Sequence, residues 1–491
     1  MTEVLIAGAG PAGLLLAGEL RLAGVDTIVV ERQPRPPGFC RSFTLNARSL
    51  DLLARRGLAG RLISEGWQAP HAPHSGLPVA LGLAGARTDH PYTLGIPQTR
   101  VEEVLEAHAL DLGADIRRGH ELCTLDEDAG SVIATITTPD GECRIRAAYL
   151  VGCDGGRSTV RKQAGIGFPG TEATHFSLLG DVEFAASGAL PYGVTTGPAG
   201  AVFVIPRPGY VRIVTADPQP PADKDTPVTL DLLQTAVDQA LGRHIELRAA
   251  RWLTRFGNAA RQAAQYVRGR IILAGDAAHI HPPAGAIGVN VALDDAFNLG
   301  WKLAATVRGT APSHLLDSYH DERHAAGAQV LANARAQMLL GEADDRLAPL
   351  IDLLTRVAIH PSGNRALAEI ITGLETCYDM RSDAAHPWLG RLAPNLSLIT
   401  EAGDTDVATL LTAGRGLLLD LTNDRDLTNG SAVRESATGW ADRLDIVDAT
   451  CPDHPELRAI LLRPDGHTAW LRTAEHDDTA NLAQALQHWY G

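Results

Sequence analysis

The stretch VLIAGAGPAGLLLAGELRLAG, Val4 to Gly24, decides the fold that we expect for this chain. A short apolar run leads into the pattern GxGxxG at Gly8–Gly13, and an apolar pattern of helical period follows it. A second apolar run, DTIVVER, ends at Glu31 and Arg32. Strand, glycine turn, helix and strand within about 30 residues are typical of a βαβ unit. The stretch therefore predicts a parallel sheet that opens on a glycine turn.

The glycine pattern has a physical reading at each position. The first glycine allows the tight turn, the second lets the backbone approach a pyrophosphate, and the third lets the helix pack on the sheet. The helix N-terminus adds free amides and a positive dipole, and Glu31 ends the next strand where a carboxylate can bind ribose hydroxyls. We interpret this unit as dinucleotide-binding, with a purely structural glycine turn as the alternative. Its candidate cofactor-binding residues are Gly8, Gly10, Pro11, Ala12, Gly13, Glu31 and Arg32.

Composition excludes several classes of partner. The chain has 491 residues, which predicts two or three domains. Its 58 acidic and 43 basic residues give a formal charge of −15, whereas nucleic acids and anionic membranes require basic patches. An uninterrupted apolar run of about 18 residues, as a membrane helix needs, is absent from the sequence. We therefore expect neither a nucleic-acid partner nor a membrane span.

The six cysteines are scattered and form no CxxC pair, which disfavours a zinc site and a disulfide scaffold. Reduced thiols fit a cytosol, and the first residues lack the basic segment of a signal peptide, so we expect a cytoplasmic location. His279 and His281 stand two residues apart without further ligands nearby, so we expect no metal site. The sequence leaves a monomer and a dimer equally open.

Two more apolar strands resemble the first one. AAYLVGCDGG (147–156) and GRIILAGDAA (269–278) each end in an acidic-glycine turn, which indicates one nucleotide-binding domain assembled from separated segments. Between them, AVFVIPRPGYVRIVTA (201–216) predicts two strands around a turn, within an inserted antiparallel sheet. Helical patterns continue to about Gly373. HPWLGRLAPNL (386–396) is predicted to be a linker, and the last hundred residues are predicted to form a small α/β domain.

These motifs together resemble the class A flavin-dependent aromatic hydroxylases, whose prototype acts on p-hydroxybenzoate. ADIRRGHE (114–121) and DSYHDERH (317–324) are similar to segments of the bacterial aromatic polyketide hydroxylases that act on angucyclinones. LLRPDGHTAWLR (461–472) is similar to the hairpin of their C-terminal thioredoxin-like domain, which lacks a redox CxxC. The resemblance covers nearly the whole chain.

The resemblance implies an α/β fold with three parts. A discontinuous Rossmann-like FAD-binding domain of the p-hydroxybenzoate hydroxylase type is expected over 1–167 and 257–385. An antiparallel-sheet domain for the substrate is expected over 168–256. The thioredoxin-like domain is expected over 395–491.

The resemblance also assigns residues to FAD. It places Arg41 against the flavin and the pyrophosphate, and a backbone group of Leu122 at the adenine. The segment IPQTR, with Gln98 and Arg100, meets the isoalloxazine and the pyrophosphate. Asp276 is expected at the ribityl hydroxyls. The complete set implied in this way is Arg41, Gln98, Arg100, Leu122, Asp154, Gly155, Gly275, Asp276, Pro283, Gly285, Gly288, Val289 and Asn290.

The loop PPAGAIGVN, residues 282–290, is expected to present backbone amides to the flavin pyrimidine edge. Related chains typically have PAGGQGMN here, so Ala286, Ile287 and Val289 depart from the pattern. An added Cβ at position 286 restricts the backbone, and Ile287 replaces a hydrogen-bonding side chain by an apolar one. Close by, we interpret Asp294 and Asp295 as complements of the helix dipole and HDERH (320–324) as a polar helix face.

The activity implied by the resemblance is FAD-dependent monooxygenation. NADPH or NADH would reduce the flavin, O2 would give a C4a-hydroperoxide, and one oxygen atom would pass to a polycyclic aromatic polyketide in antibiotic biosynthesis. The resemblance assigns no catalytic side chain. Two alternatives stay open: Baeyer–Villiger oxygenation of a polyketide ketone, and a flavoprotein without oxygenase activity that acts as a partner or a redox-neutral catalyst.

Overall fold

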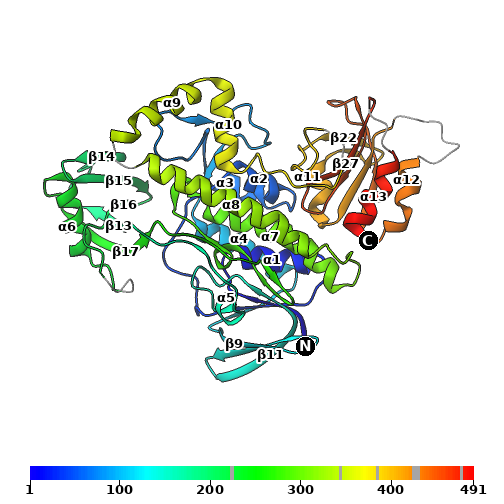
Figure 1. The fold of residues 1–491 in the computed structure, drawn as a ribbon, viewed down its shortest axis with the longest axis horizontal. Helices are drawn as coiled ribbons and strands as arrows, with labels where there is room; N and C mark the ends of the chain where they lie inside the picture. Colours follow the sequence, from blue (N-terminus) through cyan, green and yellow to red (C-terminus); the bar gives the residue numbers. More distant parts are fainter. Residues whose placement is uncertain (222–225, 342–344, 383–385, 423–431, 476–478) are drawn as a thin grey trace. The chain divides into compact units, whose positions relative to one another are not determined.

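The computed structural model describes residues 1–221, 226–341, 345–382, 386–422, 432–475 and 479–491 (Figure 1). The chain divides into two compact units. One comprises Met1–Pro169 with Gln262–Gly491, and the other comprises Gly170–Arg261. The finer division of the larger unit into a FAD-binding domain and a domain over 395–491 stays a prediction.

A largely parallel sheet organises the larger unit. Its strand order is β19-β20-β11-β1-β2-β8, and β1, β2, β11, β20 and β8 pair in parallel. The hairpin β9–β10 continues from β11 in antiparallel fashion. The bounds of these strands are β1 Thr2–Ala7, β2 Thr27–Glu31, β8 Asp115–Arg118, β9 Glu121–Glu127, β10 Val132–Thr138, β11 Gly141–Gly152, β19 Val267–Arg268 and β20 Ile271–Leu273. The predicted βαβ unit is confirmed.

Helices pack on this sheet because their apolar faces need cover. α1 packs against both α7 and α4, and α7 and α8 lie side by side along the unit (Figure 1). α7 is buried around nearly its whole circumference from Val289 to Ala304. The helix bounds are α1 Pro11–Leu22, α2 Ala47–Ala54, α3 Ala59–Glu65, α4 Gln98–Asp111, α5 Thr159–Gln163, α7 Gly288–Val307, α8 Asp317–Leu340, α9 Ala348–Ile359 and α10 Pro361–Thr372.

Short strands complete the larger unit before its last hundred residues. They form the small sheet β3-β7-β4 and the pair β5-β6. Their bounds are β3 Thr44–Leu45, β4 Trp67–Ala69, β5 His71–Ala72, β6 Leu81–Gly82 and β7 Thr93–Gly95. A further short strand outside these two sheets is β21 His279–Ile280. The predicted end of the helical region is confirmed, because α10 stops at Thr372 and Gly373 follows with φ of 72°.

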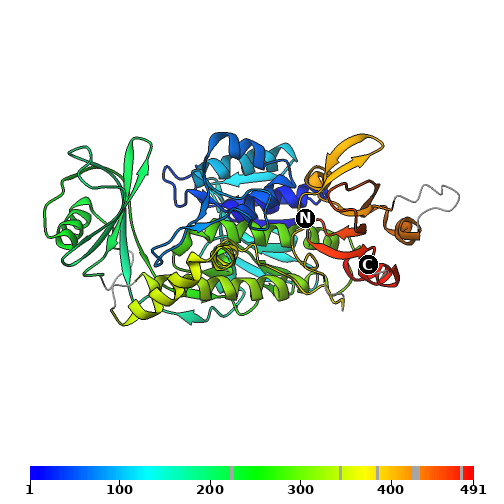
Figure 2. The ribbon, with the colours of Figure 1, turned by 90° about the horizontal axis from the view of Figure 1, so that it is seen from above.

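The smaller unit is an antiparallel sheet in the order β14-β15-β16-β13-β17. The predicted hairpin is confirmed, with Arg207 opposite Tyr210 across its turn. α6 covers one face of this sheet (Figure 2), where Leu233 and Val237 join Leu178 and Val202 in the core. The bounds are β12 Gly170–Thr171, β13 Phe176–Phe184, β14 Gly193–Gly197, β15 Gly200–Arg207, β16 Tyr210–Ala216, α6 Leu230–Leu241, β17 Leu247–Gly257 and β18 Ala260–Gln262.

The last hundred residues form an α/β arrangement around the sheet β25-β24-β26-β27. Its elements are β22 Ser397–Thr400, β23 Gly403–Asp406, α11 Val407–Leu410, β24 Gly416–Asp420, α12 Ala432–Ala437, β25 Leu444–Asp448, β26 Leu457–Leu462, β27 Thr468–Thr473 and α13 Thr479–Tyr490. The prediction of a linker over 386–396 is wrong. Leu389 and Leu392 bridge to Thr468 and His467, and Ala393 is buried in the core of this region, because the apolar residues of the segment need cover.

The helices of the described residues include none with the combination of length and apolarity that crossing a bilayer demands. The same residues contain no group of three or more His, Cys, Asp or Glu side chains placed to hold a metal ion.

Candidate functional site

The carboxyl ends of four adjacent parallel strands meet at one edge of the sheet. β20, β11, β1 and β2 are neighbours in that order, and they end at Leu273, Gly152, Ala7 and Glu31. Each strand leads directly into one of the turns proposed for the cofactor. Because ligands of open α/β sheets bind at the carboxyl ends of the strands, this edge is the candidate site.

The glycine turn after β1 has two glycines at which a Cβ would clash with backbone and one that faces open space. Gly8 has φ of 107°, and a Cβ there would lie 2.3 Å from the carbonyl oxygen of Cys153. A Cβ on Gly13 would lie 2.0 Å from the carbonyl oxygen of Gly8. A Cβ on Gly10 would meet no atom within 4 Å. Gly10 is the N-cap of α1, and the first amides of this helix, at Ala12 and Gly13, are suited to bind an anion such as a pyrophosphate.

Glu31 is held at the end of β2 beside this turn. Its Oε2 accepts a hydrogen bond from the amide of Ala9 at 2.9 Å, and its Oε1 accepts one from the amide of Gln33 at 2.9 Å. Both bonds fix the carboxylate next to the glycine turn, and each oxygen keeps a second lone pair for a ribose hydroxyl. Arg32, which follows, is exposed.

The turn after β11 contains a polar atom without a partner. Asp154 Oδ2 accepts hydrogen bonds from the amides of Thr159 at 2.6 Å and Val160 at 3.1 Å, at the start of α5. Asp154 Oδ1 is buried and accepts none from the described residues. A Cβ on Gly155, whose φ is 80°, would meet nothing within 4 Å. A buried carboxylate oxygen normally has a hydrogen-bond partner, so this turn fits a donor supplied by a bound group.

The turn after β20 places a carboxylate at the surface. Asp276 is exposed, whereas Gly275 and Ala277 on either side of it are buried. The amide of Gly275 donates to Asp295 Oδ2 at 2.9 Å, which anchors the turn to α7. Asp276 therefore has a rigid base and a free carboxylate, which fits its proposed contact with ribityl hydroxyls.

The loop from Pro283 to Asn290 presents its backbone at the start of α7. Gly285 and Ala286 both have positive φ, 70° and 52°, and Gly288 opens a helix that has no side-chain cap. The amide of Ala286 donates to the Pro283 carbonyl at 3.2 Å, whereas the first amides of α7, from Gly288 on, have no earlier helical partner and lie at the positive end of the helix dipole. Asn290 Nδ2 donates to the carbonyl of Ala286 at 3.1 Å and locks the loop onto the helix. Such a helix start fits an electron-rich edge of a cofactor.

The apolar Ile287 has a structural explanation. Its side chain is 4% exposed and packs with Val291 and Ala334, and Val330 borders the same cluster on α8. Ile287 therefore joins the loop to α8. Ala286 occupies the left-handed region at φ of 52°, where a side chain costs about 1 kcal/mol. The sequence showed the departure from the pattern but not the cluster.

Ile287→Gln is expected to reduce the free energy of unfolding by about 1–3 kcal/mol, because it buries an amide in this cluster. Ala286→Gly is expected to change it by less than about 1 kcal/mol, since relief of φ strain and the greater unfolded-state entropy of glycine oppose each other. Urea unfolding of each variant measures these changes.

In the double variant Ala286→Gly with Ile287→Gln, we also expect an altered rate of flavin reduction by NADPH. An unchanged rate would show that the loop's departure from the family pattern is neutral.

The other proposed FAD residues have different surroundings. Arg41 is exposed, with its guanidinium carbon 5.8 Å from the Phe39 ring centroid. Gln98 donates from Nε2 to Glu102 at 2.7 Å, and Leu122 is buried opposite Ile136 in the sheet. Arg100 pairs with Glu65 at 2.5 Å and with Glu103 at 2.7 Å, and these carboxylates raise its pKa. The guanidinium of Arg100 is thus engaged by carboxylates in this structure.

A buried network of charges lies directly behind the loop, where we expected a dipole effect. Asp294 accepts from Arg48 at 3.1 Å and from Arg323 at 2.8 Å. Asp295 accepts from Arg323 at 2.7 Å and from His279 Nε2 at 2.7 Å. The interpretations of Asp294 and Asp295 as complements of the helix dipole and of HDERH as a polar helix face were incomplete. Asp294, Asp295 and Arg323 are buried ion-pair partners. The sequence offered one signal: charges within a helix that is apolar all round must be paired.

Electrostatics keeps these carboxylates charged. Burial alone would raise the pKa of Asp295, but His279 and Arg323 outweigh it and hold the pKa below its usual range. The same balance lowers the pKa of Asp294, through Arg323 and Arg48. Asp295 therefore carries a full negative charge at neutral pH and can bind the Gly275 amide strongly.

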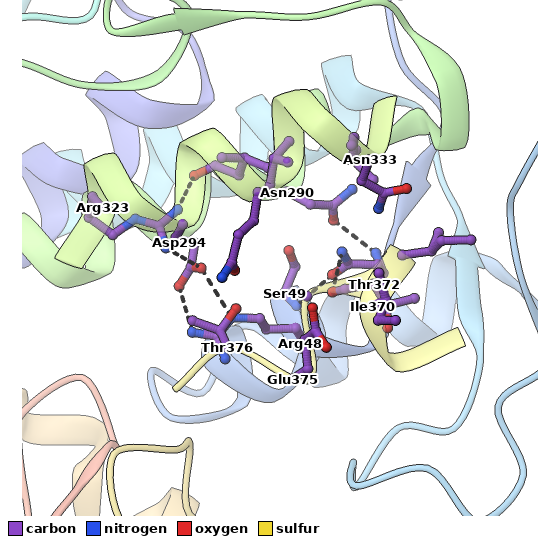
Figure 3. Close-up of a pocket in the computed structure, with 18 residues that line it drawn as sticks. Arg48, Ser49, Asn290, Asp294, Arg323, Asn333, Ile370, Thr372, Glu375 and Thr376 are labelled. Atoms are coloured by element: carbon purple, nitrogen blue, oxygen red, sulfur yellow. Dashed lines mark hydrogen bonds and ion pairs between the residues drawn. The ribbon is translucent and has the colours of Figure 1, made fainter. Parts of the chain in front are cut away.

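A cavity of about 60 Å³ adjoins this network (Figure 3). Arg48, Asp294 and Arg323 line one side, and Asn333 and Thr372 lie toward the other. A cavity of this size holds a few water molecules, whereas pockets for drug-sized ligands measure roughly 300–1,000 Å³. It is therefore too small for a polycyclic substrate.

Comparison with known proteins agrees with this geometry. Residues 1–334 match the FAD binding domain family, and residues 386–491 match the family described as aromatic-ring hydroxylase, C-terminal. The chain belongs to the FAD-dependent aromatic-ring hydroxylases. It is an FAD-dependent monooxygenase with the predicted α/β fold, and NAD(P)H and O2 are the co-substrates of this class.

Three named proteins are similar to this chain along its whole length. The 12-dehydrotetracycline 5-monooxygenase/anhydrotetracycline 6-monooxygenase of Streptomyces rimosus is 41% identical over 100% of this chain and 99% of its own. The aromatic hydroxylase CabE from angucycline biosynthesis has a TM-score of 0.92 and 38% identity over 100% and 99% of the two chains. The Diels-Alderase PyrE3 of pyrroindomycin biosynthesis has a TM-score of 0.85 and 37% identity, with 100% coverage of both chains.

Proposed function

We propose that this enzyme hydroxylates a polycyclic aromatic polyketide. The observation that carries the cofactor site is the alignment of Gly10, Glu31, Asp154 and Asp276 at the ends of adjacent strands. The substrate class is supported by relatives named for anhydrotetracycline and angucycline chemistry, which share about two-fifths of their residues with this chain. The reaction would consume NADPH or NADH and O2, and add one oxygen atom to an electron-rich ring.

The site residues have separate tasks in this proposal. The amides of Gly10, Ala12 and Gly13 would hold the pyrophosphate, Glu31 the adenosine ribose, and Asp276 the ribityl chain. Bound FAD would supply the transfer of electrons from NAD(P)H and the activation of O2. The amides at the N-terminus of α7 would stabilise negative charge on the reduced ring. The chain would therefore bind and orient FAD and stabilise charge on its ring. The described site needs no nucleophilic side chain for this.

Purified protein reconstituted with FAD tests the proposal. A polycyclic phenol is expected to stimulate NADPH oxidation, and NMR of the product is expected to show a new ring hydroxyl. A ring-expanded lactone would indicate Baeyer–Villiger oxygenation instead. A colourless protein that binds no added FAD would contradict the cofactor site itself.

A redox-neutral role is the second candidate, because PyrE3 is named a Diels-Alderase and is 37% identical to this chain. It predicts FAD binding without substrate-stimulated NADPH oxidation. Anaerobic incubation separates the two functions, since a redox-neutral catalyst converts its substrate without O2 whereas a hydroxylase does not.

A further inference from the structure

The tip of the C-terminal hairpin is buried instead of facing solvent. The turn RPDGH, residues 463–467, connects β26 and β27, and Arg463, Asp465 and His467 are each at most 1% exposed. Turns between strands usually lie at the surface. Here Arg463 donates to Glu322 of α8 at 2.6 and 3.0 Å, and Trp301 of α7 donates to Asp465 at 3.2 Å. The hairpin tip is thus anchored on the two helices behind the cofactor edge.

His467 extends this anchor to Arg48 on α2. Arg48 Nη2 lies 3.1 Å from His467 Nε2, and a guanidinium can only donate, so Nε2 must accept. The ring proton therefore resides on Nδ1, which lies 3.0 Å from Asp465 Oδ1. His467 is neutral in this arrangement, and its Nε2 lone pair fixes one end of Arg48.

Arg48 in turn fixes the start of α7. Its Nε and Nη2 donate to the two oxygens of Asp294, each at 3.1 Å. Asp294 lies one helical turn after Asn290, which locks the loop at Ala286. Two residues before Arg48, the Asn46 amide donates to Asn290 Oδ1 at 2.8 Å. A path of polar contacts and one turn of helix backbone therefore runs from His467 to the loop that precedes α7.

We propose that the RPDGH hairpin positions the flavin-binding loop, with His467 acting through Arg48. The inference rests on the cofactor site proposed above and assigns a role to the C-terminal region. His467 is a positioning residue, because it contacts Arg48 and not the reacting groups. Dithiol chemistry is not available to this region, since Cys451 is the only cysteine in residues 386–491 and it is buried.

Protonation of His467 would break the path. Arg48 from α2, Asp465 of the hairpin and Tyr378 from the segment after α10 face the imidazole, with Asp294 and Arg323 behind Arg48. Burial lowers the pKa of His467, and Asp465 offsets this in part. Because the folded state prefers the neutral ring, the stabilisation from His467 is complete above its unfolded pKa of about 6.5 and is lost as pH falls through the lowered pKa of the folded state.

The test is FAD affinity, measured by titration of the apoprotein, in two variants. His467→Phe removes the acceptor and is expected to raise the FAD dissociation constant about tenfold at pH 7.5, a loss of about 1.4 kcal/mol. His467→Gln offers a carbonyl oxygen to Arg48 and is expected to stay within about threefold of the parent protein. As pH is lowered from 7.5 through the folded pKa of His467, the parent is expected to lose more affinity than His467→Gln, because only the parent has an ionisable group at position 467.

His454→Gln is the matched control, since His454 lies on the same region and its imidazole is 33% exposed. It is expected to leave FAD affinity unchanged. Equal affinity of His467→Phe and the parent, or parallel pH profiles of the parent and His467→Gln, would overturn the inference. If His467→Phe does not fold, the pH profiles of the parent and His467→Gln still test the inference. Failure of the parent itself to bind FAD would instead contradict the proposed function.

Discussion

Asp295→Asn is expected to lower the free energy of unfolding by about 3–5 kcal/mol and to weaken FAD binding. Asp295 is fully buried and holds Arg323, His279 and the Gly275 amide together. Asparagine keeps the shape but removes the charge, and breaking a buried ion pair costs about this amount. The turn that carries Asp276 loses its anchor at the same time. Because the pKa of Asp295 is lowered, its stabilising charge is present at neutral pH and is lost only in strong acid.

Urea unfolding at pH 7 and FAD titration measure the two effects. Asp321→Asn is the matched control, because Asp321 lies on α8 beside the network but is exposed. We expect it to change stability by less than about 0.5 kcal/mol. A similar effect of both substitutions would contradict a specific role for the buried network.

Gly8→Ala is expected to destabilise the fold by roughly 3–5 kcal/mol, whereas Gly10→Ala should leave it intact and still lose FAD. The Cβ of Gly8→Ala would meet the Cys153 carbonyl oxygen at 2.3 Å, at φ of 107°. Overpacking and backbone strain add to give the expected cost. Gly10 has φ of −85°, which alanine adopts freely, and its Cβ would meet no protein atom within 4 Å.

The contrast between these two glycines locates the cofactor. Gly10→Ala is expected to keep the unfolding free energy of the apoprotein within about 0.5 kcal/mol and to raise the FAD dissociation constant at least about tenfold. Its Cβ would fill space that a pyrophosphate needs. Calorimetry of the apoprotein and quenching of FAD fluorescence measure the two quantities. Normal FAD affinity in Gly10→Ala would place the pyrophosphate elsewhere.

Local patterns predicted the strands and turns of this edge well. Strand, glycine turn and helix lie within one short segment, so β1, α1 and β2 could be predicted from period and spacing alone. The acidic-glycine turns after β11 and β20 could be recognised because each follows an apolar strand. More than a hundred residues of chain separate these turns from β1. The order of strands in the sheet brings them next to it.

The buried charges could not be predicted in the same way. Asp294 pairs with Arg48 and Arg323, and Glu322 pairs with Arg463, so the partners come from distant segments. In sequence, HDERH has the composition of a solvated helix face. The proline-rich segment at 386–396 has the composition of a linker, yet its apolar residues find cover in the C-terminal core. The composition of a segment therefore indicates its exposure only where no distant segment packs on it.

Isotope labelling with ¹⁸O2 tests whether this protein is an FAD-dependent hydroxylase. The FAD-reconstituted enzyme is supplied with NADPH, a polycyclic phenol and ¹⁸O2, and the product is analysed by mass spectrometry. An FAD-dependent hydroxylase predicts one ¹⁸O atom in each product molecule and no product without O2. Product formation without ¹⁸O incorporation, at the same rate under anaerobic conditions, would contradict the account.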